Sequence, residues 1–293
     1  MKVLVIKHGA FGDIVLAFPA MSAIRAAHPG ARITLLTTRP YAGLLGASPW
    51  FDEVRVDAKP EGWNLPGLWR LKRQLAGFDL VYDLQTSGRS SRYFALAGRP
   101  RWSGVARGCA LPHRDANRDH IHTRERLAGQ LRDAGIGTLP VPDLSWLAGD
   151  ISGFNLPPDY AALVPGAAPH RPEKRFPAEK FADVARGLGM PVVVVGTAGE
   201  HDLARAIGGI DLTGRTDFFQ LASVFRGAAL AIGNDTGPMH LAAALGVRCI
   251  ALFSAASDPA LTAPRGPDGG WPIILRAPNL QDLAVAQVLA ALP

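Results

Sequence analysis

Short apolar runs alternate with helix-like patterns along this chain, and that alternation limits the fold more than any other feature. Apolar residues spaced three or four positions apart mark a helix face, whereas short continuous apolar runs mark buried strands. In the first half the runs lie at 3–6, 33–36, 54–56 and 80–84, and the helical patterns at 14–27, 41–45 and 68–75. A β-α-β-α order of this kind predicts a parallel sheet with helices on both faces.

The alternation stops near the middle of the chain and then begins again. Residues 139–158 contain Pro140, Pro142, Pro157 and Pro158, with glycines among them, which is typical of a linker. Beyond it we expect strands at 161–164, 192–195 and 250–253, helices at 178–188 and 280–292, and a strand-loop-helix unit over 229–245. The sequence therefore predicts an α/β protein of two doubly wound, Rossmann-like domains, residues 1–152 and 153–293.

The composition indicates a globular protein with an anionic partner. Hydrophobic residues make up 48% of the 293 residues and charged residues 19%. Apolar runs fall short of the roughly 20 residues that cross a bilayer, and the N-terminal run ends too early for a signal peptide, so we expect a cytoplasmic protein. The net charge of +6 favours a nucleic acid, a nucleotide or an anionic membrane surface. The arginines that are dense between 89 and 132 form either a solvated surface or a site for an acidic acceptor or a lipid headgroup.

The loop after the first strand, KHGAFGD, carries the first set of candidate residues, Lys7, Gly9, Gly12 and Asp13. In parallel sheets such loops, at the carboxyl ends of strands, bind ligands. The two glycines permit close backbone approach or positive φ. A carboxylate at the start of a helix either caps that helix or, beside a lysine, acts as a general base near an anion site. The G-x-G-x-x-G fingerprint of nicotinamide dehydrogenases is absent from this loop.

A second loop, GNDTGPMH at 233–240, leads from a strand into a helix. Asp235 or Thr236 suits the helix cap, and Pro238 suits the first turn. The N–H groups of Thr236 and Gly237 would then face a ligand, and a helix N-terminus attracts phosphate.

Further cations follow the strand at 161–164. The loop contains Gly166, and Arg171, Lys174 and Arg175 come after it. Lys174 is either an ordinary solvated side chain or a point charge that neutralises a departing diphosphate.

The histidines of the H-x-H pattern at 120 and 122 do not predict a metal site. In a helix over 119–133, residues two apart do not share a face. We therefore expect no metal.

Three stretches together resemble glycosyltransferase family nine, the lipopolysaccharide heptosyltransferases. They are KHGAFGDIVLAFPAMSAIR, LVPGAAPHRPEKRFPAEKFADVA and IGNDTGPMHLAAALGVRCIALFSAASDP, joined by VVVVGTAGEHDLA and DLTGRTDFFQLA in the family's order. The resemblance implies the GT-B architecture, in which two Rossmann-like domains face each other across a cleft. The N-terminal domain would bind the acceptor and the C-terminal domain the nucleotide-sugar donor.

The resemblance also implies roles for individual residues. Asp13 matches the family's catalytic base, with Lys7, Gly9 and Gly12 in the same active-site loop. The implied donor-binding residues are Lys174, Asp235, Thr236, Gly237, Met239, His240, Gly166 and Glu200. His122 and Arg126 would meet an anionic acceptor.

The implied reaction is an inverting, metal-independent transfer of heptose from ADP-heptose to an acidic lipopolysaccharide core. The donor is a substrate, so no cofactor is expected, and neither is a nucleic-acid partner. A lipid-linked acceptor implies visits to the inner face of the inner membrane. Three alternatives stay open: a transferase that uses another nucleotide sugar for a different envelope glycan, a nucleotide-sugar epimerase of the same architecture, and a non-catalytic binding protein.

Overall fold

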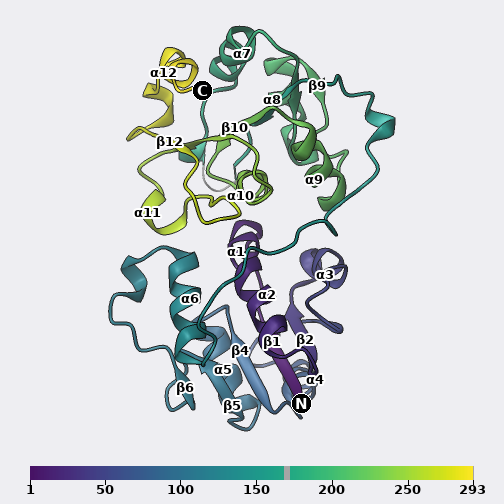
Figure 1. Ribbon diagram of the computed structural model, residues 1–293, viewed down its shortest axis with the longest axis vertical. Helices are drawn as coiled ribbons and strands as arrows, with labels where there is room; N and C mark the ends of the chain where they lie inside the picture. Colours follow the sequence, from purple (N-terminus) through teal and green to yellow (C-terminus); the bar gives the residue numbers. More distant parts are fainter. Residues whose placement is uncertain (168–171, 293) are drawn as a thin grey trace. The chain divides into compact units, whose positions relative to one another are not determined.

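The computed structural model describes residues 1–167 and 172–292, and the chain divides into two compact units, Met1–Trp146 and Leu147–Pro293. The division falls inside the proline-containing segment 139–158; the boundary expected from sequence follows residue 152. Each unit is a parallel sheet with helices (Figure 1). The fold class is therefore α/β with two Rossmann-like units, as the sequence predicts.

The N-terminal sheet has the strand order β3-β2-β1-β4-β5-β6, and all its pairings are parallel. Its strands are β1 (Lys2–Ile6), β2 (Arg32–Thr37), β3 (Glu53–Val56), β4 (Leu80–Asp83), β5 (Arg101–Gly104) and β6 (Leu111–Pro112). Its α-helices are α1 (Phe11–Leu16), α2 (Phe18–Ala27), α3 (Arg39–Gly46), α4 (Leu65–Leu75), α5 (Gly88–Leu96) and α6 (Thr123–Asp133). The apolar faces of α4 and α5 pack on the sheet around the fully buried Trp102.

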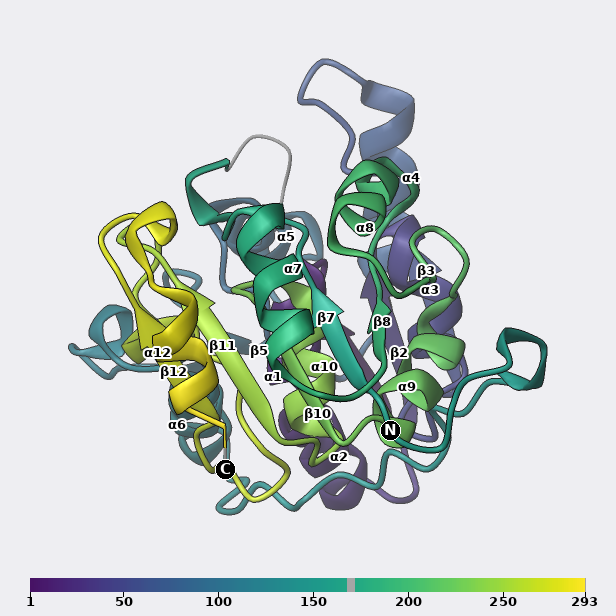
Figure 2. The same ribbon diagram turned by 90° about the horizontal axis from the view of Figure 1, so that it is seen from above.

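The C-terminal sheet repeats this topology in the order β12-β11-β10-β7-β8-β9. Its strands are β7 (Ala161–Val164), β8 (Val192–Val194), β9 (Ile210–Asp211), β10 (Leu230–Asn234), β11 (Cys249–Phe253) and β12 (Ile273–Arg276). Its α-helices are α7 (Ala178–Gly187), α8 (His201–Ile207), α9 (Phe218–Gly227), α10 (Gly237–Ala244), α11 (Pro259–Thr262) and α12 (Val285–Ala290). Figure 2 shows α7 and α12 on one side of this sheet and α10 on the other.

The strand order reverses at one point in each sheet, and this point decides where a ligand binds. In the N-terminal sheet the reversal lies between β1 and β4, and in the C-terminal sheet between β7 and β10. Open parallel sheets bind ligands at the carboxyl ends of the strands at such a switch point. The loops predicted from sequence to carry the chemistry, 7–13, 165–167 and 235–236, follow β1, β7 and β10 at these points.

The structure corrects the expected helix over 14–27. It begins at Phe11 and is divided at Ala17 into α1 and α2. Pro19 explains the division, because proline has no N–H with which to continue the helical hydrogen bonds. The expected helix over 280–292 is also shorter: a 3₁₀ turn spans Leu280–Asp282, and α12 begins at Val285.

Among the described residues, none of the helices is both long and apolar enough to cross a bilayer.

Candidate active site

Asp13 lies in the first turn of α1, at the carboxyl edge of the N-terminal sheet. Its Oδ2 accepts a hydrogen bond from the backbone N–H of Ala10 at 3.2 Å. Within the described residues, its Oδ1 has no hydrogen-bond partner, and the side chain is half-buried. Asp13 therefore closes the start of the helix with one oxygen and keeps the other available to accept a proton.

Lys7 lies beside Asp13 as a buried amine. Its Nζ donates to the backbone oxygen of Leu84 at 3.4 Å, across the switch point between β1 and β4. Burial lowers the pKa of Lys7, and the charge of Arg126 lowers it further, while Asp13 and Asp83 act in the opposite direction. Lys7 thus places a buried amine next to the loop that carries Asp13.

Gly9 and Gly12 differ in what the loop requires of them. Gly9 has φ of +139°, and a Cβ there would lie 2.7 Å from Cε2 of Tyr41, so glycine is needed for both conformation and space. Gly12 is the second residue of α1 and has a helical conformation. The expected positive φ therefore occurs at Gly9.

A buried network, not recognised in the sequence, fixes the same loop. Nε2 of His8 lies 3.0 Å from Oδ2 of Asp57, and the Tyr93 hydroxyl donates to that same oxygen at 2.7 Å. Burial favours the neutral form of Asp57, but hydrogen bonds from His8 and Tyr93 outweigh it and lower the pKa. The His8 backbone is also bound, by the Gln85 side chain to its N–H and by the Thr38 hydroxyl to its carbonyl.

Asp83, at the end of β4, is a second buried acid that the sequence did not indicate. Its Oδ1 accepts the backbone N–H groups of Gln85 and Thr86 at 3.1 and 3.0 Å. Burial raises its pKa to about 6 despite these hydrogen bonds. Asp83 shapes the loop after β4, next to the backbone oxygen that accepts from Lys7.

Two arginines lie at the same edge of the sheet. The Arg118 guanidinium donates to the Thr86 hydroxyl at 3.1 Å, and that of Arg126 donates to the Thr123 hydroxyl at 2.8 Å. Burial and then the charge of Arg118 lower the pKa of Arg126, and its nearby acids are Asp119 and Asp13. Asp119 Oδ1 lies 3.0 Å from the Arg118 guanidinium and 3.9 Å from that of Arg126, so this exposed carboxylate pairs with both.

His122, expected with Arg126 to meet an acceptor, caps α6 instead of facing outward. Its side chain is buried, and Nδ1 accepts the backbone N–H of Arg124 at 3.1 Å. His120 ends a separate 3₁₀ turn and is exposed. Among the described residues no group of three or more His, Cys, Asp or Glu side chains is placed to hold a metal ion.

In the C-terminal unit, Lys174 and Asp235 form a close ion pair. Lys174 Nζ lies 2.6 Å from Oδ2 of Asp235, and the Ser257 hydroxyl donates to the same oxygen at 2.7 Å. Burial by itself would raise the pKa of Asp235, but His240 and Lys174 outweigh it and bring the value to about 2. His240 Nε2 lies 3.8 Å from Oδ1 of Asp235. Arg171, considered with Lys174 in the sequence, lies outside the described residues.

The start of α10 presents backbone donors beside this pair. Thr236 occupies the N-cap position, and its hydroxyl donates to the Asn234 carbonyl at 3.2 Å without capping the helix. In the described part of the chain, the N–H groups of Thr236 and Gly237 have no hydrogen-bond partner. The helix dipole adds to their positive potential, so this turn suits a phosphate group.

The next two residues of this motif lie inward. Met239 is fully buried, and a Cβ added to Gly233 would lie 2.9 Å from its Sδ, so Met239 packs beneath the loop. His240 is buried as well, and its Nδ1 has no hydrogen-bond partner among the described residues.

Asn234 links the two strands at the C-terminal switch point, a role that the sequence did not indicate. Its Nδ2 donates to the Pro165 carbonyl at 2.7 Å, and its Oδ1 accepts the Phe176 N–H at 3.0 Å. The neighbouring Gly166 leaves space for the Glu200 carboxylate, which a Cβ at that position would overlap. Glu200 in turn accepts the Thr197 N–H at 2.7 Å.

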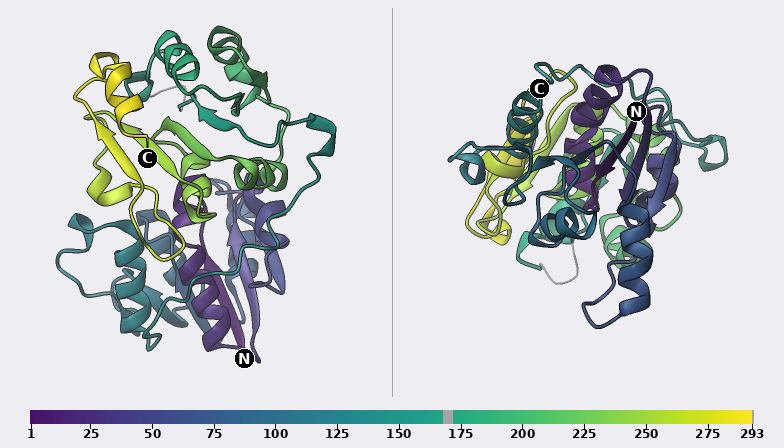
Figure 3. Two further views of the ribbon diagram at one scale, coloured as in Figure 1. Left: turned by 45° about the horizontal axis from the view of Figure 1, so that its top comes forward. Right: turned by 90° about the horizontal axis from the view of Figure 1, so that it is seen from below.

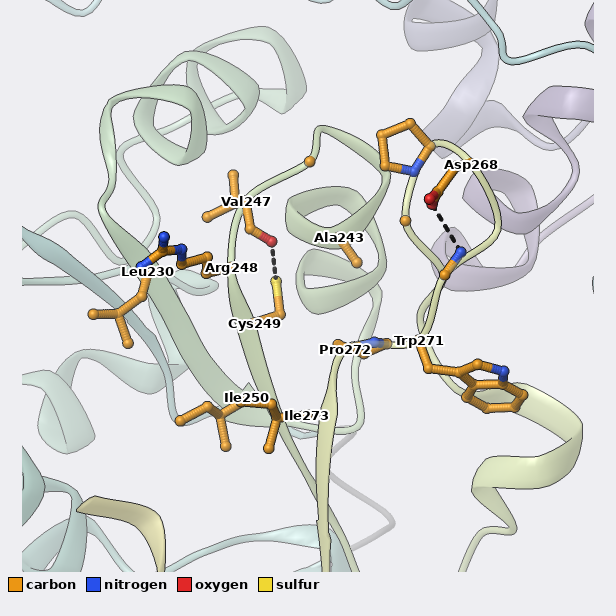
Figure 4. A pocket seen from close by; sticks show the side chains of 14 residues that line it. Leu230, Ala243, Val247, Arg248, Cys249, Ile250, Asp268, Trp271, Pro272 and Ile273 are labelled. Carbon is orange, nitrogen blue, oxygen red and sulfur yellow. Dashed lines mark hydrogen bonds between the residues drawn. The ribbon is translucent and has the colours of Figure 1, made fainter. Parts of the chain in front are cut away.

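A separate open pocket of about 500 Å³ lies at the opposite edge of the C-terminal sheet (Figure 4). The starts of β10, β11 and β12 line it, together with the loop 266–272. Trp271 lies on this loop, and the Arg265 guanidinium is 3.6 Å from the centre of its ring. Because it lies at the amino ends of the strands, this pocket is distinct from the loops described above.

Comparison with known proteins shows what the chain is similar to. Residues 144–272 match the model of glycosyltransferase family 9 (heptosyltransferase). The chain is 27% identical over 304 aligned residues to lipopolysaccharide heptosyltransferase 2 of Escherichia coli K12, covering 90% of this chain and 85% of that protein. Both comparisons point to glycosyltransferase family 9.

Solved structures agree with this chain in fold. A family 9 glycosyltransferase from Veillonella parvula superposes with a TM-score of 0.83 at 23% identity, over 99% of this chain and 95% of that one. The E. coli heptosyltransferase WaaC, solved with ADP, superposes with a TM-score of 0.72 at 22% identity, over 98% of both chains.

Proposed function

We propose that this enzyme transfers heptose from ADP-heptose to an acidic lipopolysaccharide core acceptor, with inversion and without a metal ion. The observation that carries the proposal is the Lys174–Asp235 pair beside the unbonded N–H groups of Thr236 and Gly237, at a switch point where ligands bind. The relatives of this family are named for heptosyl transfer, and one of them is solved with ADP.

The C-terminal unit would bind the donor through its diphosphate. The N–H groups of Thr236 and Gly237 donate to phosphate oxygens, and Lys174 supplies a full positive charge. As the glycosidic oxygen leaves with the diphosphate, negative charge grows on it, and these fixed donors stabilise that charge. Asp235 holds the Lys174 amine in place and accepts from hydroxyls of the donor sugar.

The N-terminal unit would supply the base. Oδ1 of Asp13 takes the proton of the acceptor hydroxyl while that oxygen attacks the anomeric carbon. The new carbon–oxygen bond forms on the face opposite to the leaving ADP, so the configuration at the anomeric carbon inverts. The role of the base suits Asp13 because, within residues 1–167 and 172–292, only its Oδ2 is engaged in hydrogen bonding, with the Ala10 N–H.

The acceptor side is cationic, which matches an acidic glycan. Arg118 and Arg126 lie at the carboxyl edge of the N-terminal sheet, and Lys7 lies beneath them. Carboxylates or phosphates of the acceptor would pair with the guanidiniums in bidentate fashion. His122 would support this surface through the start of α6, where it caps the helix.

The test is thermal stabilisation of the enzyme by ADP, UDP, GDP and NAD at equal concentration. A ligand that binds only the native state raises its stability. We expect ADP to give the largest shift. A larger shift from UDP or GDP would indicate that the donor is a UDP- or GDP-linked sugar. A response to NAD alone would contradict a sugar-transferase function.

Incubating the enzyme with ADP-heptose in the absence of acceptor distinguishes an epimerase from a transferase. An epimerase would convert the donor under these conditions, whereas a transferase leaves it essentially unchanged. A protein that binds ADP but acts on the donor neither with nor without acceptor would be a binding protein.

A further inference from the structure

Exposed apolar side chains gather at the start of α4. Among the residues that the structure describes, seven large apolar side chains are exposed, and three of them lie within seven positions of the sequence. Trp63 is 83% exposed, Leu65 71% and Trp69 58%. Single exposed apolar residues need no explanation, but a cluster with two tryptophans marks an interaction surface.

The helix itself does not require these residues. Its inner face, formed by Leu68, Leu71 and Leu75, packs toward the sheet, and Leu71 and Leu75 are buried. Leu65 and Trp69 are one turn apart and share a different face. Trp63 precedes the N-cap residue Asn64, a position from which a side chain often packs back on the helix, yet it remains exposed.

Cations border this apolar cluster. Arg70, Lys72 and Arg73 lie on exposed positions of α4, and the Arg73 guanidinium is 4.7 Å from the centre of the Trp69 ring. Glu61 is the one acid between residues 58 and 75, and it lies 3.8 Å from Arg89. The segment therefore combines tryptophans with a local excess of positive charge.

The position of the cluster relates it to the N-terminal site. The loop from the carboxyl end of β3 leads into α4, so the helix begins at the same edge of the sheet as the loop with Asp13. Arg89, at the start of α5, donates to the Pro60 carbonyl at 3.2 Å and fixes this loop. Figure 2 and Figure 3 show α4 and the loop before it projecting from the N-terminal unit.

We propose that Trp63, Leu65 and Trp69, with Arg70, Lys72 and Arg73, form a docking surface for an anionic phospholipid bilayer. Tryptophan prefers the headgroup level of a membrane, and leucine inserts below it. Lysines and arginines beside them are attracted to anionic headgroups. The positive charge of the surface favours an anionic bilayer as its partner. A second copy of this chain is disfavoured, because two such cationic surfaces repel each other.

This inference rests on the proposed function, because that function gives the docking surface its purpose. The test of the inference does not depend on the proposed function. A lipid-linked acceptor remains in the membrane, so an enzyme held there by α4 meets it at the edge that carries Asp13. Vesicle binding by the full chain is measured without donor or acceptor, and its outcome is therefore independent of the transfer reaction.

The experiment is flotation of the full chain with two kinds of vesicle, phosphatidylcholine alone and an equal mixture with phosphatidylglycerol. One variant combines Trp63→Ser, Leu65→Ser and Trp69→Ser, and another combines Arg70→Gln, Lys72→Gln and Arg73→Gln. Their controls are Val141→Ser, an exposed apolar residue elsewhere, and the combination of Arg107→Gln, Arg132→Gln and Arg248→Gln, which removes three exposed charges elsewhere. Circular dichroism and thermal unfolding verify that each variant is folded.

We expect the wild type and both controls to float with the anionic vesicles. Removal of three cations from the surface should weaken partitioning about a hundredfold, and high salt should weaken wild-type binding because it screens the charges. Brominated lipids should quench the tryptophan fluorescence of the wild type more than that of the Trp63→Ser, Leu65→Ser, Trp69→Ser variant.

Three results would overturn the inference: a wild type that does not float, α4 variants that float as the wild type does, or a wild-type dimer that the Trp63, Leu65 and Trp69 substitutions convert to monomer. Transfer to a soluble, lipid-free acceptor is measured in parallel and should be the same in wild type and α4 variants. Its absence in the wild type would count against the proposed function and leave the vesicle result intact.

Discussion

Lys174 Nζ and Asp235 Oδ2 lie 2.6 Å apart at the carboxyl edge of the C-terminal sheet, and both side chains are largely buried. A buried lysine and a buried aspartate stabilise each other's charge, so removing one leaves the other costly to keep ionised. The pair therefore links the cation that would meet the donor diphosphate to the acid that would meet the donor sugar. Changing either residue should alter nucleotide binding.

Replacing Lys174 with alanine should weaken stabilisation by ADP. At an ADP concentration about 100 times Kd, the wild type should gain roughly 2.7 kcal/mol. The variant loses the positive charge on the phosphates, so its thermal shift at the same concentration should be much smaller. Arg205→Ala removes an exposed cation from the same unit and should keep the full shift. Equal thermal shifts in the Lys174→Ala variant and the wild type would show that this lysine does not bind the nucleotide.

Replacing Asp13 with asparagine should abolish transfer while preserving the fold. The asparagine oxygen still accepts from the Ala10 N–H, so unfolding by urea should change little. A general base contributes about 10²- to 10⁴-fold to a reaction rate, and kcat should fall by that amount. ADP binding should be unchanged, because the nucleotide site lies on other residues. If the variant is less stable yet transfers at the wild-type rate, Asp13 acts only as a helix cap.

Asp235 should make the protein less stable in acid. Its pKa of about 2 lies below the ordinary 3.8, so the folded state binds fewer protons than the unfolded state between these values. The stabilisation is present above about pH 4 and is lost as the pH falls toward 2, in total about 2 kcal/mol. Urea unfolding of wild type and Asp235→Asn at several pH values isolates this contribution. A difference between them that does not vary from pH 2 to 5 would contradict the low pKa.

Asp83 should have the opposite effect. Its pKa of about 6 lies above 3.8, so the folded state binds more protons, and stability falls as the pH rises from about 4 to 6. Asp83→Asn keeps an oxygen for the Gln85 and Thr86 N–H groups but does not ionise. Relative to wild type, its free energy of unfolding should increase by about 2 kcal/mol between pH 4 and 7. If the difference in the free energy of unfolding between Asp83→Asn and wild type stays constant over this range, the pKa of Asp83 lies near its ordinary value.

The loops that bear the candidate site were predictable because local sequence determines them. A fully apolar strand followed by a glycine-containing loop and a helix identifies a carboxyl end, and KHGAFGD and GNDTGPMH both have this form. Apolar runs such as VLVI and VVVV also predicted the central strands. The similarity to glycosyltransferase family 9 followed from the combined stretches, and the comparisons confirm this similarity.

The networks beneath those loops were not predictable because their members are distant in sequence. Tyr93 and Asp57 are 36 positions apart, and Asp57 meets His8 only when β3 and β1 lie in one sheet. Asn234 stands in a recognised motif, but its bonds to Pro165 and Phe176 depend on β7 pairing with β10. Short edge strands such as β6 and β9 also lack a pattern of their own, since two residues have no periodicity.

The most direct test of the central claim is transfer from ADP-heptose to a heptose-deficient lipopolysaccharide core, followed by ADP release and mass spectrometry, with and without EDTA. We expect a product one heptose heavier, ADP released only when both substrates are present, an inverted anomeric configuration by NMR, and no effect of EDTA. Transfer from a UDP- or GDP-sugar in preference to ADP-heptose, or loss of transfer in EDTA that added metal restores, would contradict the proposed reaction.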